Sequence, residues 1–215
     1  MGAAAVLVTG RLRTATVLVG VATAVAAANA LRFAADVPID AILYGDQRSS
    51  AVTALLEALG RERTAVVLYL AVRSWDAIIL LTAVAPAFYW LLGSTAIHAA
   101  ARLRGRHRPY RPMLVLLGYA VAVTRLPADL AGAILGSGRG VGPQVAQLIG
   151  TASLVLLGVI AWRGIQAHYG LARGPALGVL LIAAALFYIV PFVVIVLAAV
   201  AILVAAVALD YVPGL

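Results

Sequence analysis

The sequence predicts an all-α integral membrane protein, a polytopic bundle of transmembrane helices, from three observations. Apolar residues make up 64% of the 215 residues, and only 11% are charged. A soluble domain is nearer half apolar and a quarter charged, so this chain lacks the polar groups that would cover a surface in water. Mean hydropathy is +1.06, and the apolar residues gather in runs long enough to cross a bilayer.

Five segments have the composition of a membrane span, which takes about 20 mostly apolar residues with charges at its ends. The last of them runs for about 52 Å as a helix, which exceeds the ~30 Å hydrocarbon core. No polar turn divides it, so we expect one tilted helix that bends at Pro191. The five segments are residues 14–34, 77–101, 112–135, 144–162 and 175–209.

The first apolar segment has an alternative interpretation. Arg11 and Arg13 precede it, and small residues around Asn29 follow, as in a cleavable signal peptide. A membrane span is the favoured interpretation, with cleavage of residues 1–30 as the alternative.

The distribution of arginine predicts the orientation. All sixteen basic residues are Arg, and the net charge is +8. If the amino terminus lies inside, nine arginines and no acid fall in the inner segments, and five arginines fall in the outer ones. Five arginines lie within residues 102–111 alone. Because basic loops face the cytoplasm, we expect the amino terminus inside and the carboxyl terminus outside, in a cell membrane.

Residues 35–76 form the sizeable segment outside the bilayer. Val52, Leu55, Leu56 and Leu59 repeat at the spacing of one apolar helix face. This pattern predicts an amphipathic helix in the outer interface, within a chain that is otherwise one membrane domain over residues 1–215.

Arg125 and Asp129 form a candidate polar pair within the third span. They are four residues apart and therefore share a helix face. Charges inside a membrane are costly and often functional, but a structural ion pair near the outer interface is the simpler interpretation. The other polar residues at a similar depth are Asn29, Arg32, Gln144 and Gln147.

No catalytic or metal site is expected. Ser94 and His98 are four apart, but an interfacial histidine is the better interpretation, because a serine hydrolase needs its base from a different helix. Cysteine is absent, and no motif combines a nucleophile, a base and oxyanion donors. We therefore expect a non-enzymatic protein without a cofactor or metal.

Small residues predict close helix packing. They repeat every fourth position in two spans, which lets helices approach within the chain or between copies in a homo-oligomer. These residues are Gly20, Ala24 and Ala28 in the first span, and Gly118 and Ala122 in the third.

Two stretches resemble the Yip family of five-span membrane proteins, whose eukaryotic members interact with small GTPases. One runs from Trp90 through the basic loop to Ala120, and the other is His168 to Gly174. Together they cover about a quarter of the chain. The resemblance implies the fold and a non-enzymatic membrane role. It does not extend to GTPase binding, because the family's cytosolic amino-terminal domain and acidic motif are not found, and Ala172 stands where Ser is usual.

These observations predict a membrane organiser or adaptor that binds partners through its inner loops. Anionic lipid headgroups or a protein partner are expected there, and nucleic acid is not, because the loops lie between spans. A small transporter or channel that uses Arg125 and Asp129 is the alternative. The expected contact residues are Arg102, Arg104, Arg106, Arg108, Arg111, Arg163 and Arg173.

Overall fold

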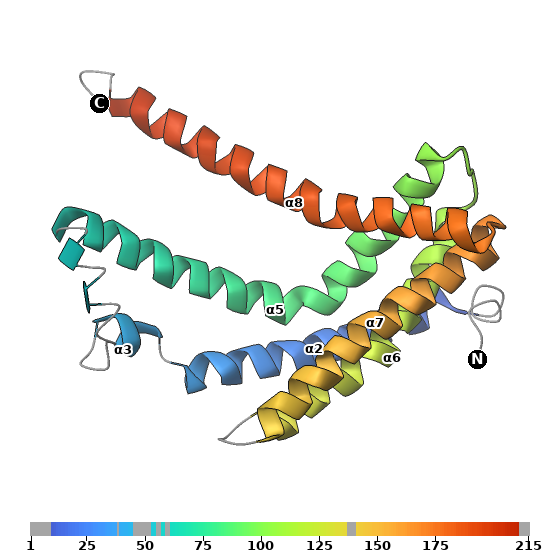
Figure 1. Cartoon of the computed structure of the whole chain (residues 1–215), viewed down its shortest axis with the longest axis horizontal. Helices are drawn as coiled ribbons and strands as arrows, with labels where there is room; N and C mark the ends of the chain where they lie inside the picture. Colours follow the sequence, from blue (N-terminus) through green and yellow to red (C-terminus); the bar gives the residue numbers. More distant parts are fainter. Residues whose placement is uncertain are drawn as a thin grey trace. The chain divides into compact units, whose positions relative to one another are not determined.

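A computed structural model describes residues 10–37, 39–44, 53–54, 57–58, 61–136 and 141–210, and most of these residues are helical. No strand occurs within these ranges, so the all-α prediction is confirmed for them. In chain order (Figure 1), the helices are α2 (Leu12–Asp36), α3 (Ile39–Tyr44), α5 (Arg61–Leu103), α6 (Tyr110–Leu135), α7 (Val141–Tyr169) and α8 (Arg173–Asp210).

Four helices in the described residues are long and apolar enough to cross a membrane, which supports the prediction of a membrane protein. They are Leu12–Asp36, Val66–Leu103, Tyr110–Leu135 and Val141–Tyr169, and they contain the first four predicted spans. α8 is one continuous helix of 38 residues, as expected. Its apolar stretch within the described residues is the shorter Arg173–Ile189, so a fifth crossing stays a prediction.

The helix that contains the second predicted span begins before that span, at Arg61. We expected the span to start at Ala77, after an outer segment, but α5 is a single helix of 43 residues. Between Thr64 and Ala77 the sequence contains no glycine or proline to end a helix. Arg73 pairs with Asp76 one turn away at 3.3 Å, so these charges are compatible with a continuous helix.

The predicted interfacial helix lies largely outside the described residues. Val52, Leu55, Leu56 and Leu59 all fall there. Of the outer segment 35–76, the structure describes the end of α2, residue 37, the six-residue α3, residues 53–54 and 57–58, and the first part of α5.

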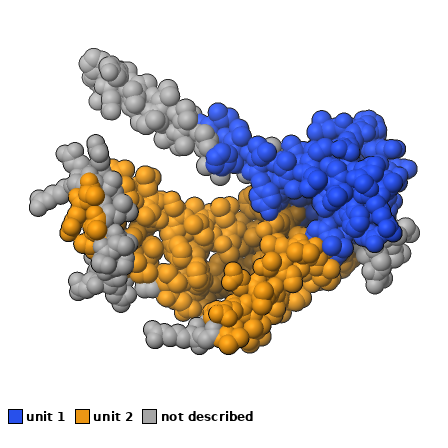
Figure 2. Space-filling view, viewed as in Figure 1, with its two compact units in different colours: residues 1–12, 90–117, 158–215 blue, residues 13–89, 118–157 orange. Residues whose placement is uncertain are grey.

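Two compact units divide the chain (Figure 2). Unit 1 contains residues 1–12, 90–117 and 158–215, and unit 2 contains residues 13–89 and 118–157. The core of unit 1 joins α5, α6, α7 and α8 through buried side chains such as Ile97, Met113, Leu116, Ile165 and Val179.

In unit 2, α2 buries a stripe of small residues that differs from the predicted one. Gly20, Ala24 and Ala28 are exposed, and a methyl group added at Gly20 would meet nothing within 4 Å. This face is therefore not packed against other described residues, and its packing between copies stays a prediction. Gly118 and Ala122 of α6 are buried, as expected. The buried residues of α2 are Ala15, Val19, Ala22, Ala26 and Ala30.

Candidate functional site

The seven predicted contact arginines all belong to unit 1 and are all exposed. We call them the basic surface: Arg102, Arg104, Arg106, Arg108, Arg111, Arg163 and Arg173. None of them forms an ion pair with another described residue, since the ion pairs found there involve Arg32, Arg73 and Arg125. In the whole sequence of unit 1 the one acid is Asp210, far along the chain from Arg173. Within the described part of the chain, the positive charge of the basic surface is therefore not paired with any acid.

Glycines end the two helices that lead into the basic surface. Gly105 follows α5 with φ of 72°, and Gly170 follows α7 with φ of 64°. After α5, the amide of Arg106 donates to the carbonyl of Ala101 at 3.0 Å. After α7, the amide of Leu171 donates to the carbonyl of Gln166 at 3.2 Å. Both are glycine caps that need left-handed backbone, so the chain turns sharply at both places.

Contacts between distant parts of the sequence hold these two turns together. His168 Nε2 lies 2.9 Å from the carbonyl oxygen of Pro109. Trp162 Nε1 donates to the carbonyl of Arg173 at 3.1 Å. The guanidinium of Arg104 lies so close to Gly178 of α8 that a methyl group there would be 2.8 Å from Arg104 Nη2. The basic surface is therefore built from both turns and the start of α8.

Aromatic and histidine side chains pack beneath the basic surface. His98 Nδ1 lies 3.0 Å from the hydroxyl of Tyr169, and the His98 ring packs edge-on to Tyr110 at 5.2 Å. Tyr110 and Thr95 are joined through their hydroxyls at 3.1 Å. The hydroxyl of Ser94 donates to the Trp90 carbonyl, so Ser94 and His98 contact different partners.

Replacing Tyr169 with phenylalanine tests this packing. The hydrogen bond to His98 is lost, and we expect unfolding to become easier by about 1 kcal/mol. Tyr119→Phe is the control, because the Tyr119 hydroxyl makes no hydrogen bond to any described residue. Thermal unfolding in detergent measures both variants, and an equal effect of the two would contradict a role for the His98 contact.

The structure joins Arg125 and Asp129, as their spacing predicts. Arg125 Nη2 lies 3.0 Å from Asp129 Oδ1, and their side chains are only 16% and 12% exposed. The guanidinium also lies over the ring of Tyr89, 5.9 Å from its centre. Arg125 Nε and Asp129 Oδ2 are buried and have no hydrogen-bond partner among the described residues. The pair is therefore buried but incompletely satisfied.

Of the four other polar residues predicted at this depth, two lie beside the pair. The side-chain amide of Asn29 donates to the backbone carbonyl of Asp129. Arg32 donates to the carbonyl of Ala133 one turn further on. Gln144 and Gln147 are exposed on α7 and are not brought to the pair by any contact within the described ranges. The polar residues thus join α2 to α6.

No family model, curated protein or solved structure matches this chain. The described residues also contain no group of three or more histidine, cysteine, aspartate or glutamate side chains that could hold a metal ion.

Sequence reasoning missed the aromatic partners of the charged and histidine side chains. Tyr89 lies 36 positions before Arg125, and Tyr169 lies 71 after His98. A signal was present for Tyr110, which stands two residues before the proposed start of the third span, whereas Tyr89 lies inside the second span and Tyr169 lies between the fourth and the fifth. Aromatic residues favour such positions in membrane helices, but this preference does not identify their partners.

Proposed function

We propose that this chain is a non-enzymatic, five-span membrane protein of the Yip family that works as an adaptor or membrane organiser. Its amino terminus lies inside the cell and its carboxyl terminus outside. The basic surface faces the cytoplasm and binds an anionic partner, either lipid headgroups or an acidic protein surface. The observation that carries the proposal is the exposure of seven arginines in a unit whose sequence contains a single acid.

Electrostatics explains why such a surface binds anions. An arginine near an anionic membrane surface contributes about 1 kcal/mol of attraction. The two capped turns hold the arginines in place without using their guanidinium groups in ion pairs. The positive charge therefore remains available to a partner, and we expect binding to weaken with added salt.

Neutralising the basic turn tests the adaptor function. In the variant Arg104→Gln/Arg106→Gln/Arg108→Gln we expect about a hundredfold weaker binding to an anionic partner, since three arginines are lost at ~1 kcal/mol each. The control, Arg48→Gln/Arg61→Gln/Arg63→Gln, removes as many charges from the proposed outer side. Crosslinking and affinity capture from native membranes identify the partner, and titration with it or with anionic nanodiscs measures the loss. Equal binding by both variants would refute the proposal.

A small transporter is the second candidate, and one observation favours it. Arg125 Nε and Asp129 Oδ2 are buried without hydrogen-bond partners among the described residues, so this site has unused capacity for a water molecule, a proton or an ion. Substrate flux in proteoliposomes that disappears when both residues are neutralised, in a protein that stays folded, would favour transport over the adaptor.

A further inference from the structure

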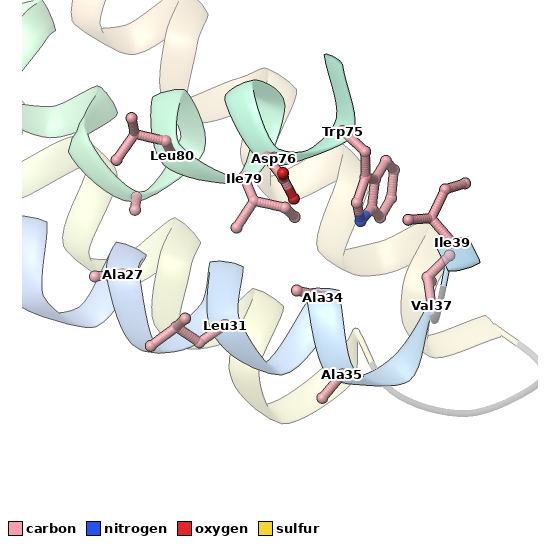
Figure 3. A pocket seen from close by; sticks show the side chains of 11 residues that line it. Ala27, Leu31, Ala34, Ala35, Val37, Ile39, Trp75, Asp76, Ile79 and Leu80 are labelled. Atoms are coloured by element: carbon pink, nitrogen blue, oxygen red, sulfur yellow. The ribbon is translucent and has the colours of Figure 1, made fainter. Parts of the chain in front are cut away.

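A groove of about 670 Å³ lies between α2 and the first half of α5, within unit 2 (Figure 3). Small side chains line it on both helices, Ala27 and Ala34 on α2 and Ala83 on α5. Its volume lies in the range of about 300–1,000 Å³ that is usual for ligand pockets. Leu31 and Leu80 also line it and are 68% and 64% exposed, so the groove is apolar and open to the surroundings of the helices.

One end of the groove is polar. Figure 3 shows the ring of Trp75 and the carboxylate of Asp76 directed from α5 towards α2. The Trp75 ring packs against Phe33 of α2 at 5.4 Å between ring centres. Tryptophan favours the boundary between hydrocarbon and water. An occupant that fills the whole groove is therefore an amphiphile, apolar along its length and polar at the end beside Trp75.

Charge restricts the polar end of the occupant. Among the described residues that line the groove, Asp76 is the charged one. Arg73 contacts Asp76 Oδ2 at 3.3 Å, and its guanidinium lies over the Tyr69 ring at 5.4 Å from the ring centre. Asp76 Oδ1 accepts no hydrogen bond from any residue that the structure describes. A headgroup that donates hydrogen bonds and carries positive charge complements this oxygen, whereas a headgroup that ends in an anion does not.

We propose that this groove binds a membrane phospholipid with a primary ammonium headgroup, of the phosphatidylethanolamine class. One acyl chain lies along the alanines between α2 and α5, and the ammonium group donates to Asp76 Oδ1. This site is separate from the basic surface and goes beyond the proposed adaptor function.

A headgroup series tests the proposal on the unmodified protein. Full-length protein in detergent is mixed with phosphatidylethanolamine, phosphatidylcholine and phosphatidylglycerol that have identical acyl chains, and native mass spectrometry counts the bound lipids. Phosphatidylcholine is the matched probe, because its methylated ammonium has the same charge and no hydrogen to donate. We expect three- to tenfold preference for phosphatidylethanolamine over both other lipids, the effect of one charge-assisted hydrogen bond at a partly exposed site. Equal retention of the three lipids, or preference for phosphatidylglycerol, would overturn the proposal.

Two pairs of variants assign the preference to the groove. Asp76→Asn removes the charge at nearly constant volume and should abolish the headgroup preference. Asp36→Asn should preserve it, because Asp36 pairs with Arg32 in the same way at 3.8 Å but does not line the groove. Ala34→Phe fills the groove and should lower the total of bound lipid, whereas Ala24→Phe, on the exposed face of the same helix, should not. An unchanged headgroup preference in Asp76→Asn would contradict the proposal. So would a dimer that Ala34→Phe dissociates, because a second copy of the chain would then occupy the groove.

Discussion

Replacing Gly164 with alanine will strongly destabilise the protein. Gly164 lies in α7 where that helix packs against α6, and an added methyl carbon would be 2.0 Å from Cδ2 of Leu116. Leu116 is 2% exposed and belongs to the core of unit 1, so a shift of its side chain would disturb the other core residues. Overpacking of a filled core costs about 1–3 kcal/mol, and we expect the upper end of that range in thermal or denaturant unfolding in detergent.

Gly158→Ala is the matched control for this prediction. Gly158 lies in the same helix, and nothing is within 4 Å of the position of its missing methyl group. Its replacement should be neutral or slightly stabilising, because alanine favours helix over glycine by about 1 kcal/mol. A second check is the double variant Gly164→Ala/Leu116→Ala, in which the two losses should be less than additive because the residues contact each other. If Gly164→Ala and Gly158→Ala unfold alike, the close packing of α6 and α7 is wrong.

Removing one member of the Arg125–Asp129 pair will also destabilise the protein, while removing both will not. With Arg125→Met alone, the Asp129 carboxylate stays largely buried without its partner, which costs about 3 kcal/mol for a buried pair. In Arg125→Met/Asp129→Leu no charge remains, and stability should return to within about 1 kcal/mol of the unmodified protein. The measurement is the free energy of unfolding in detergent for both single variants and the double variant.

The exposed pair Arg73–Asp76 is the control for the buried one. Its side chains are 64% and 57% exposed, so Arg73→Met should cost less than about 1 kcal/mol. Flux measured on the stable double variant then separates the two candidate functions, because a structural pair can be replaced without loss of function and a transport pair cannot. If the double variant stays as unstable as the single variants, each charge is stabilised by groups other than its partner in the pair.

The membrane class and the spacing of charged pairs were predictable from the sequence. Long apolar runs identify membrane helices, because the hydrocarbon core excludes charged side chains over about 30 Å, and a helix needs about 20 residues to cross that distance. Arg125 and Asp129 could be paired in advance because a four-residue spacing places both on one helix face. Such spacings follow from the geometry of a single helix and do not depend on its neighbours.

Helix boundaries and packing faces were less predictable. The second span was predicted to begin at Ala77, whereas the helix that contains it, α5, begins at Arg61. The exposed stripe Gly20, Ala24 and Ala28 had the same small-residue spacing as buried Ala22, Ala26 and Ala30. Where several faces of a helix carry small residues, the four-residue spacing of those residues does not identify the face that packs.

The sequence by itself determined that most of these side chains belong in hydrocarbon and that positive charge gathers in two short turns. Only the tertiary structure decided that those turns meet, through His168 and Pro109, which are 59 residues apart. It also decided that Asn29 reaches Asp129 across 100 residues. The physical reason is the range of the forces involved: hydrophobicity and helical spacing act locally along the chain, whereas partners distant in sequence are chosen by how whole helices pack.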